Sequence, residues 1–195
     1  MKVSKQKVAE HREQIIAAAA KRFRENGFDG ISVADLMKEA GLTHGGFYGH
    51  FSSKEELVGL ASQRALRETA QKWEKVMGEF PDNPFEAFAK YYLSPRHQSH
   101  PEAGCLFATL GSDLARQPLS VKEAVMKEQR AIVDLLSRFA PGRTKSVRRK
   151  QAISFLALLV GGMILARSAP DGVLSEEILK TVSASVANSV RSDAS

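Results

Sequence analysis

Cys105, the single cysteine, is the residue of this sequence best suited to covalent chemistry. It follows Gly104 at the predicted start of a short helix, where helix amides lower the pKa of a thiol and favour the nucleophilic thiolate. His97 and His100 precede it, and a His-x-x-His pair with a cysteine would in principle suit zinc or a Cys–His nucleophile. Because the segment is polar and no carboxylate is placed to orient either histidine, we expect no metal site and no catalysis. Two interpretations of Cys105 stay open: a sensor that an oxidant or a reactive carbonyl modifies, or an inert thiol that lines a pocket.

A second group of residues, in the stretch 32–51, is suited to binding a nucleic acid. Ser32 is the predicted N-cap of one helix, Gly41 suits the left-handed conformation that ends it, and Thr43 is the predicted N-cap of a second helix. The free backbone amides at the start of this second helix would face outward, where a phosphate group is favoured. This layout predicts a helix-turn-helix, whose second helix enters the major groove of DNA.

The second helix of this motif has a low intrinsic stability. It contains Gly45, Gly46 and Gly49, and each glycine costs about 1 kcal/mol relative to alanine in a helix. We therefore expect Phe47 and Phe51, which are one turn apart, to hold the helix by packing. The small residues would let the backbone come close to DNA. The side chains expected to point outward are His44, Tyr48 and His50. The alternative is a glycine-rich turn that binds nothing.

The elements that must position these residues are predicted to be helices, because apolar residues recur at helical spacing and no strand-like alternation is present. The predicted helices span about residues 12–26, 33–40, 44–50, 54–77, 84–93, 103–115, 120–139, 143–169 and 175–191, with 95–102 as a loop. Besides Ser32, three further serines are predicted helix caps: Ser53 and Ser120, each with a glutamate three residues later, and Ser175. The predicted fold class is therefore all-α, with about nine helices.

The composition is that of an ordinary folded protein, with 43% hydrophobic and 26% charged residues in a chain of 195. The net charge is +6, but the run 143–150 supplies most of it and is expected to be a solvated face, so the total is not evidence for DNA binding. A single cysteine excludes a disulfide framework and suits the reducing cytoplasm. The longest apolar run, 152–166, is shorter than the roughly 20 residues that cross a bilayer, and no signal peptide is apparent. We expect a cytoplasmic protein that does not span a membrane.

The sequence Gly-Leu-Thr-His-Gly-Gly-Phe-Tyr-Gly-His-Phe-Ser-Ser-Lys-Glu-Glu-Leu, over residues 41–57, resembles the signature of the TetR-type one-component transcriptional regulators. The resemblance implies a DNA-binding domain over 1–57, with its helix-turn-helix at 32–51, and a ligand-binding and dimerisation domain over 58–195. It implies phosphate contacts from Ser32, Thr43, Tyr48 and Lys54, and base-edge contacts from His44, Gly45 and Gly46, with His50 at the far end of the same helix. Two glycines at base-reading positions leave direct readout mainly to His44 and Tyr48, so the shape of the groove would carry more of the specificity.

The resemblance further implies a ligand pocket and a homodimer interface in the second domain. The residues expected to line the pocket are Trp73, Met77, Phe88, Tyr91, Tyr92, Cys105 and Thr109, although such an aromatic set would equally fill a helical core. Residues 152–166 are apolar on every helical face and must be buried on every face. The residues expected at the dimer interface are Leu158, Gly161, Gly162, Leu165, Val182, Val186 and Val190, the alternative being one large core around a central helix.

Together these features predict a homodimeric transcriptional repressor that a small-molecule inducer releases from a palindromic DNA operator, with no cofactor and no metal. The Gly-Cys-Leu at 104–106 is similar to the electrophile-sensing, N-ethylmaleimide-responsive branch of the family, so release through modification of Cys105 is one alternative. A cysteine-dependent enzyme, an architectural DNA binder without a ligand and a transcriptional activator are the others. Lys2, Lys5 and Lys7 would form either an arm along the DNA or a solvated tail.

Overall fold

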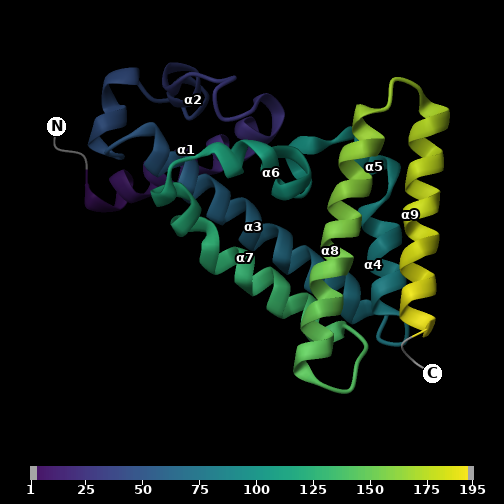
Figure 1. The fold of residues 1–195 in the computed structure, drawn as a ribbon. Coiled ribbons are helices and arrows are strands. Elements are labelled where there is room, and N and C mark those ends of the chain that lie inside the picture. The colour runs from purple at the N-terminus through teal and green to yellow at the C-terminus, as the bar shows by residue number, and fades with distance from the viewer. Residues whose placement is uncertain (1–3, 193–195) are drawn as a thin grey trace.

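The computed structural model describes residues 4–192, and within them the only regular elements are helices (Figure 1). The α-helices are α1 (Lys5–Asn26), α2 (Val33–Glu39), α3 (Lys54–Glu79), α4 (Pro84–Tyr92), α5 (Pro95–Ser99), α6 (Leu106–Arg116), α7 (Leu119–Phe139), α8 (Lys145–Ser168) and α9 (Gly172–Ser192). Two short 3-10 helices are η1 (His44–Gly49) and η2 (Pro101–Ala103). The prediction of an all-α fold is confirmed.

The N-terminal unit consists of α1, α2, η1 and the first turns of α3, at the upper left of Figure 1. One side of each element is apolar at helical spacing, and these sides meet in a small core that includes Ile15, Leu36 and Leu57, all fully buried. Helix α3 continues out of this unit into the larger one, so a single rigid element joins the two.

The larger unit is built on two helix pairs. Helices α3 and α7 lie side by side, and α8 with α9 forms an antiparallel hairpin that packs against α4 and α7 (Figure 1). Aromatic rings fill the space between the pairs. The ring centroids of Phe85 and Phe155 are 4.0 Å apart, and those of Trp73 and Phe88 are 4.8 Å apart. A pair at the distance of Trp73 and Phe88 contributes stability beyond its buried area.

Several predicted helix boundaries were wrong because a nearby residue starts a helix earlier. Helix α1 begins at Lys5 with Ser4 as its cap, so Lys5 and Lys7 are helical and form no arm, while Lys2 lies outside the described residues. Residues 95–102 are α5 and η2 instead of a loop, since Ser94 caps α5 and Pro95 begins it.

Two of the four predicted serine caps, Ser120 and Ser175, were also wrong. Pro118 precedes Leu119 at the start of α7, so Ser120 lies inside the helix and caps nothing. In α9 the carboxylate of Asp171 accepts the Leu174 amide at 2.7 Å, and Ser175 is buried, donating to the carbonyl of Ala166 at 2.8 Å.

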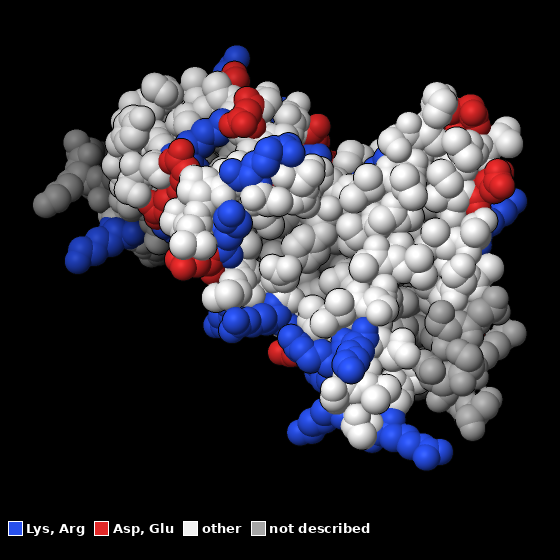
Figure 2. Space-filling view, in the orientation of Figure 1, with Lys and Arg blue, Asp and Glu red and all other residues white. Residues whose placement is uncertain are grey.

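Helix α8 has one side in the core and one side bare. Phe155, Leu159 and Met163 are buried, whereas Leu158 and Leu165 are exposed. Figure 2 shows this bare side as a surface almost free of charge, with Lys and Arg gathered at its lower end, where residues 143–150 lie.

Gly162 and Val186, expected at a dimer interface, lie inside the protomer. Both are buried, and Gly162 faces the side chain of Val182 in α9 of the same chain. The side chain of Val190 lies outside the described residues. The interhelical contact inside the protomer therefore uses the glycine that the sequence assigned to a partner.

Among the described residues one helix, α8, is long and apolar enough to cross a membrane by length and composition alone. The helix has 24 residues and is longer than the apolar run 152–166, whose short length was the reason to expect no membrane span. Of its most apolar window, 33% is buried in the protein. Near its end, Arg167 donates to the carbonyls of Gln98 and Ala108 at 3.1 and 3.2 Å. These contacts are those of a core helix with one uncovered face.

The contact of Gly162 with α9 leads to a testable prediction. An alanine Cβ at this position would lie 2.9 Å from a methyl carbon of Val182, whereas at Gly78 in α3 it would meet nothing within 4 Å. Overpacking costs about 1–3 kcal/mol, so Gly162→Ala should be less stable than Gly78→Ala by about that amount. Both variants gain the helix propensity of alanine, which makes Gly78→Ala a matched control. Chemical denaturation measures the difference, and equal stabilities would show that α8 and α9 do not pack as described.

Candidate nucleic-acid interface and cavity

The element that would meet DNA, η1, is a single short 3-10 helix held from one side. Phe47 is fully buried and Phe51 is 2% exposed, and their ring centroids are 5.4 Å apart. On the opposite side Tyr48 is 74% exposed. The prediction that two phenylalanines hold this helix by packing is therefore confirmed.

Thr43 stands at the N-cap of η1 but its hydroxyl makes no cap hydrogen bond, so the predicted side-chain cap was wrong. Instead its backbone carbonyl accepts the Gly46 amide at 3.0 Å. A 3-10 turn satisfies this amide through the carbonyl three residues back, so it needs no hydroxyl. The exposed Thr43 hydroxyl is left available for another acceptor or donor.

Gly45 and Gly49 face open space. A Cβ built on either would meet nothing within 4 Å, and neither residue has a positive φ angle. Neither packing nor backbone conformation therefore requires glycine at these positions. What the two glycines provide is a flat outer face, on which a ligand could approach the backbone closely.

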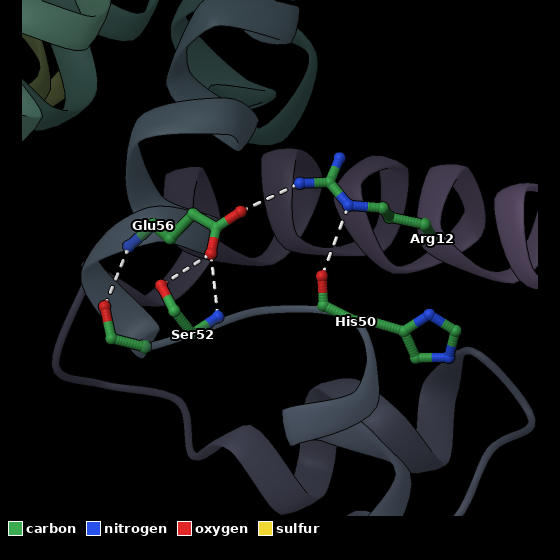
Figure 3. Close-up of polar contacts among 5 residues, drawn as sticks. Arg12, His50, Ser52 and Glu56 are labelled. Atoms are coloured by element: carbon green, nitrogen blue, oxygen red, sulfur yellow. Dashed lines mark hydrogen bonds and ion pairs between the residues drawn. The ribbon is translucent and has the colours of Figure 1, made fainter.

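An ion-paired cluster fixes η1 relative to α1 and α3 (Figure 3). The guanidinium of Arg12 donates to one carboxylate oxygen of Glu56 at 2.9 Å and to the carbonyl of His50 at 3.3 Å. The other oxygen of Glu56 accepts the backbone amide and the hydroxyl of Ser52, each at 2.7 Å. The Ser53 hydroxyl accepts the Glu56 amide at 3.2 Å, so the predicted cap is present, although Glu56 reaches the amide of Ser52 rather than that of Ser53.

His50 does not point outward, so this part of the sequence prediction was wrong. Its ring lies 6.2 Å from that of His11 in α1, and its Nδ1 atom is buried without a partner among the described residues. Burial lowers the pKa of His50, and the positive charges of His11 and Arg12 lower it further. The lowered pKa favours the neutral imidazole, and the ring belongs to the α1–η1 contact instead of the outer face of η1.

The two remaining residues expected to bind phosphate already have protein partners. The Lys54 ammonium donates to the carbonyl of Ile31 at 3.0 Å, which leaves two of its three hydrogens free. The Ser32 hydroxyl caps α2 by accepting the Asp35 amide at 3.1 Å and donates to the Asp35 carboxylate at 2.5 Å. His44, like Thr43 and Tyr48, is exposed on the outer side.

A cavity of about 180 Å³ lies between α3 and the segment 94–105. Its lining residues are Thr69, Lys72, Trp73, Tyr91, Ser94, Arg96, His97, His100, Ala103, Gly104 and Cys105. Of the residues expected to line a pocket, Trp73, Tyr91 and Cys105 do so. Met77, Phe88 and Tyr92 are fully buried and are absent from the lining, and the Thr109 hydroxyl is bonded to the carbonyls of Cys105 and Leu106. Met77, Phe88 and Tyr92 fill the helical core, because their helices turn them away from the cavity, whereas Thr109 is half-buried and bonded to its own helix.

His97 connects Tyr92 to Cys105 through hydrogen bonds of both its ring nitrogens. Its Nδ1 atom lies 2.6 Å from the carbonyl of Tyr92, and its Nε2 atom accepts the Cys105 amide at 2.9 Å. A carbonyl only accepts and an amide only donates, so the proton must be on Nδ1. Burial lowers the pKa of His97 to about 4. Both ring nitrogens are thus committed to the backbone, and His97 is neither a metal ligand nor a base here.

The Cys105 thiol is buried, and burial raises its pKa. The hydroxyl of Tyr92 and the amides of Ala108 and Phe107 favour the thiolate, but their combined effect is smaller than the cost of desolvation. The expectation that the start of a helix activates this cysteine was therefore wrong. The interpretation as an unreactive thiol that lines a pocket fits this structure.

The segment is also tied to the N-terminal unit. The guanidinium of Arg24 in α1 donates to the carbonyl of Gly104 at 3.0 Å, across 80 residues of sequence. Arg24 is only 9% exposed, and its Nε atom has no partner among the described residues. Desolvation lowers the pKa of this guanidinium. This buried cation, bonded to a single carbonyl, links the N-terminal unit directly to the cavity wall. No pattern in the sequence indicated this contact.

The N-terminal unit matches a known protein family in sequence. Residues 15–61 match the model described as bacterial regulatory proteins, tetR family. The HTH-type transcriptional repressor NemR of Escherichia coli (strain K12) is 26% identical over 130 residues, which make up 65% of this chain and 65% of NemR. The HTH-type transcriptional regulator TtgR of Pseudomonas putida is 42% identical over 55 residues, or 28% of this chain and 26% of TtgR. The matched segments thus span less than two thirds of either relative.

Solved structures extend the likeness to the whole fold. The crystal structure of reduced E. coli NemR has a TM-score of 0.71 at 22% identity and covers 89% of this chain and 96% of NemR. A TetR-family regulator from Cytophaga hutchinsonii has a TM-score of 0.76 at 18% identity, covering 96% of this chain and 98% of that one. At such identities the likeness establishes the helical architecture.

The cluster around Glu56 generates a prediction. Glu56→Ala removes its bonds to Arg12 and Ser52 and should cost about 1 kcal/mol, because the carboxylate is partly exposed and solvent screens it. Glu55→Ala makes the same charge change in the same helical turn without touching Arg12 and is the control. Thermal unfolding measures both variants, and equal losses would contradict the role of the cluster.

The pH dependence of this effect follows from the same contacts. The amide and hydroxyl of Ser52, followed by Arg12, hold the pKa of Glu56 below its ordinary value. Its stabilisation is therefore complete above the ordinary carboxyl pKa and is lost as the pH falls through the lowered value. The difference in stability between wild type and Glu56→Ala should disappear in acid.

Proposed function

The chain belongs to the TetR family of helix-turn-helix transcriptional regulators, and on that premise we propose that it is a homodimeric repressor that a small molecule releases from a palindromic operator. As a member of this family it is a regulator and not an enzyme. The observation that carries the proposal is η1, a helix held by Phe47 and Phe51 with its opposite face bare. The curated relative NemR, which is named a transcriptional repressor, supports repression over activation.

The reading surface consists of the outer side of η1 and the residues that flank it. Tyr48, Thr43 and the two free hydrogens of Lys54 would contact phosphates, and the exposed His44 would reach a base edge. Gly45 and Gly49 let the backbone approach the groove. His50 is excluded because it faces α1. Residues 1–57 would thus form the DNA-binding domain and residues 58–195 the regulatory domain.

The bare face of α8 supports a homodimer. Ile153, Leu158, Gly161, Ile164 and Leu165 form a continuous apolar strip on the outside of the protomer. A second copy of the same helix is the simplest cover for such a strip, and a two-fold axis makes it self-complementary. A dimer would present two copies of η1 to successive major grooves, roughly 34–36 Å apart on a palindrome. Such a protein would act in the cytoplasm, on the chromosome.

The hydrogen bond from Arg24 to Gly104 joins the cavity to the N-terminal unit, which contains η1. A compound that enters the cavity contacts Gly104 and Cys105 directly, so any shift of this segment is passed to α1. For a release mechanism, the compound must bind more tightly to a conformation in which η1 no longer fits its operator. Release by covalent modification of Cys105 is less well supported, because the thiol is buried and its pKa is raised.

Operator binding by variants tests the reading surface. Lys54→Ala should weaken binding and lower the slope of log affinity against log salt by about one, as expected for one lost phosphate contact. Tyr48→Phe should weaken binding through loss of one hydroxyl contact. The control is Lys145→Ala, in the basic run at the start of α8, which should change neither quantity. Fluorescence anisotropy with an operator selected from genomic DNA measures all three. A larger effect from Lys145→Ala would place the DNA on a different face from the one proposed.

The link through Arg24 is tested without an inducer. Trp73 is the single tryptophan of the chain and lines the cavity, so its fluorescence reports on that wall. Linkage is reciprocal, so operator binding should change Trp73 fluorescence in the wild type. In Arg24→Met the change should be lost, while operator affinity falls less than about tenfold. Lys21→Met, an exposed position on the same helix, is the control and should behave as wild type. An unchanged response in Arg24→Met would rule out this link.

A further inference from the structure

The cavity has an apolar floor and a positively charged rim. Trp73, Gly104 and Cys105 form an apolar floor, with Trp73 and Cys105 3% and 2% exposed. A volume of about 180 Å³ is small for a ligand site. Because a cavity of about 150 Å³ in another protein holds benzene, this one suits a single ring with one small substituent. A ring of that size would lie against the indole of Trp73.

One hydroxyl on the floor is free. Thr69 is 5% exposed and lines the cavity, and its hydroxyl has no hydrogen-bond partner among the described residues. His97 cannot supply a second polar contact, because the backbone occupies both of its ring nitrogens. The floor therefore offers one aromatic face and one hydroxyl, which is a poor match for a ligand with many polar groups.

The rim carries positive charge that no acid balances. Lys72 and Arg96 line the mouth, and neither side chain makes an ion pair or a hydrogen bond within residues 4–192. No aspartate or glutamate among the described residues lines the cavity. Glu102, the acid of the neighbouring η2, instead interacts electrostatically with Arg24 and Arg167. Two unpaired cations at the mouth of an apolar cavity attract an anion and repel a cation.

We propose that this cavity binds a monocyclic aromatic carboxylate, with its ring on Trp73 and its carboxylate between Lys72 and Arg96. The proposal rests on the function proposed above only in taking the bound compound as the releasing ligand. A neutral ring would leave both cations unpaired, and a ring that carries an ammonium group would be repelled. A compound with several fused rings would exceed the volume. The exposed side of the carboxylate would stay in water, where Tyr91 borders the mouth.

Titration of the protein with benzoate, followed by Trp73 fluorescence, tests the ligand class. Benzoate should quench the emission saturably. Benzyl alcohol, which has a similar shape but no charge, should bind about tenfold more weakly, since it makes no charge-assisted hydrogen bond. Benzylamine should not bind. Raising the salt concentration should weaken the binding of benzoate and leave that of benzyl alcohol unchanged. Equal affinity for benzoate and benzyl alcohol, or no saturable quenching by benzoate, overturns the proposal.

Three variants locate the carboxylate. Lys72→Ala and Arg96→Ala should each weaken benzoate binding about three- to tenfold, the loss of one partly solvated charged contact. Lys75→Ala, three residues along α3 and outside the lining, is the matched control and should bind benzoate as the wild type does. All three positions are exposed, so folding should be unaffected, and circular dichroism verifies this. If Lys75→Ala weakens binding as much as Lys72→Ala does, the carboxylate is not at this rim.

Operator binding in the presence of benzoate separates this inference from the proposed function. Quenching of Trp73 together with release of DNA supports both. Quenching without release supports the ligand class and counts against release of the operator by a ligand in this cavity. Release of DNA without quenching overturns the ligand site and leaves the proposed function in place.

Discussion

The segment between α4 and α6 depends on donors from other parts of the chain. Short helices such as α5 and η2 expose the carbonyls of their last turns, and buried carbonyls must find donors. Arg167 of α8 supplies them at His97 and Gln98 and also donates to Ala108 in the first turn of α6, and Arg24 of α1 supplies one at Gly104. Arg24 is buried and Arg167 is half-buried, so each carbonyl gains a charged donor while each guanidinium gives up part of its contact with water. The wall of the cavity is therefore held between the N-terminal unit and α8.

This arrangement has a direct consequence for regulation. A segment that packs on its own core could move without affecting its neighbours, but this one cannot shift without breaking a bond to α1 or to α8. Arg24 is costly to keep buried, since its Nε atom has no partner among the described residues and its pKa is lowered by desolvation. Losing the Gly104 carbonyl would leave the buried guanidinium without its acceptor, so a displacement of this segment is coupled to α1. The link therefore lies at the place where a ligand in the cavity would act.

The reader element shows a second compromise between stability and access. Three glycines deprive η1 of intrinsic stability, and a 3-10 helix of six residues has few hydrogen bonds of its own. Its position is fixed from behind, by the packing of Phe47 and by the cluster of Arg12 and Glu56. Support from one side only leaves the other face bare, as a surface that must fit into a groove requires. Helix α8 shows the same arrangement, because one side packs in the core and the apolar strip on its outer side is uncovered.

The sequence by itself determined the features that arise within a few residues. Periodic apolar positions predicted the helices, the spacing of Phe47 and Phe51 predicted the packing of η1, and the run 41–57 indicated the family. Ser53 was correctly predicted as a cap because capping is local, while Ser120 and Ser175 failed because Pro118 and Asp171 start those helices first. Local signals compete, and the sequence does not say which of them prevails.

The tertiary structure alone decided everything that depends on distant partners. Arg12 meets Glu56 across 44 residues and Arg24 meets Gly104 across 80, and no spacing rule connects such pairs. The inward turn of His50, the contact of Gly162 with Val182 and the raised pKa of Cys105 likewise depend on which surfaces come together. Burial outweighed the local effect of a helix start at Cys105, because removing a charge from water costs more than a few amides return. Local structure is determined by neighbouring residues, whereas desolvation depends on the complete tertiary structure.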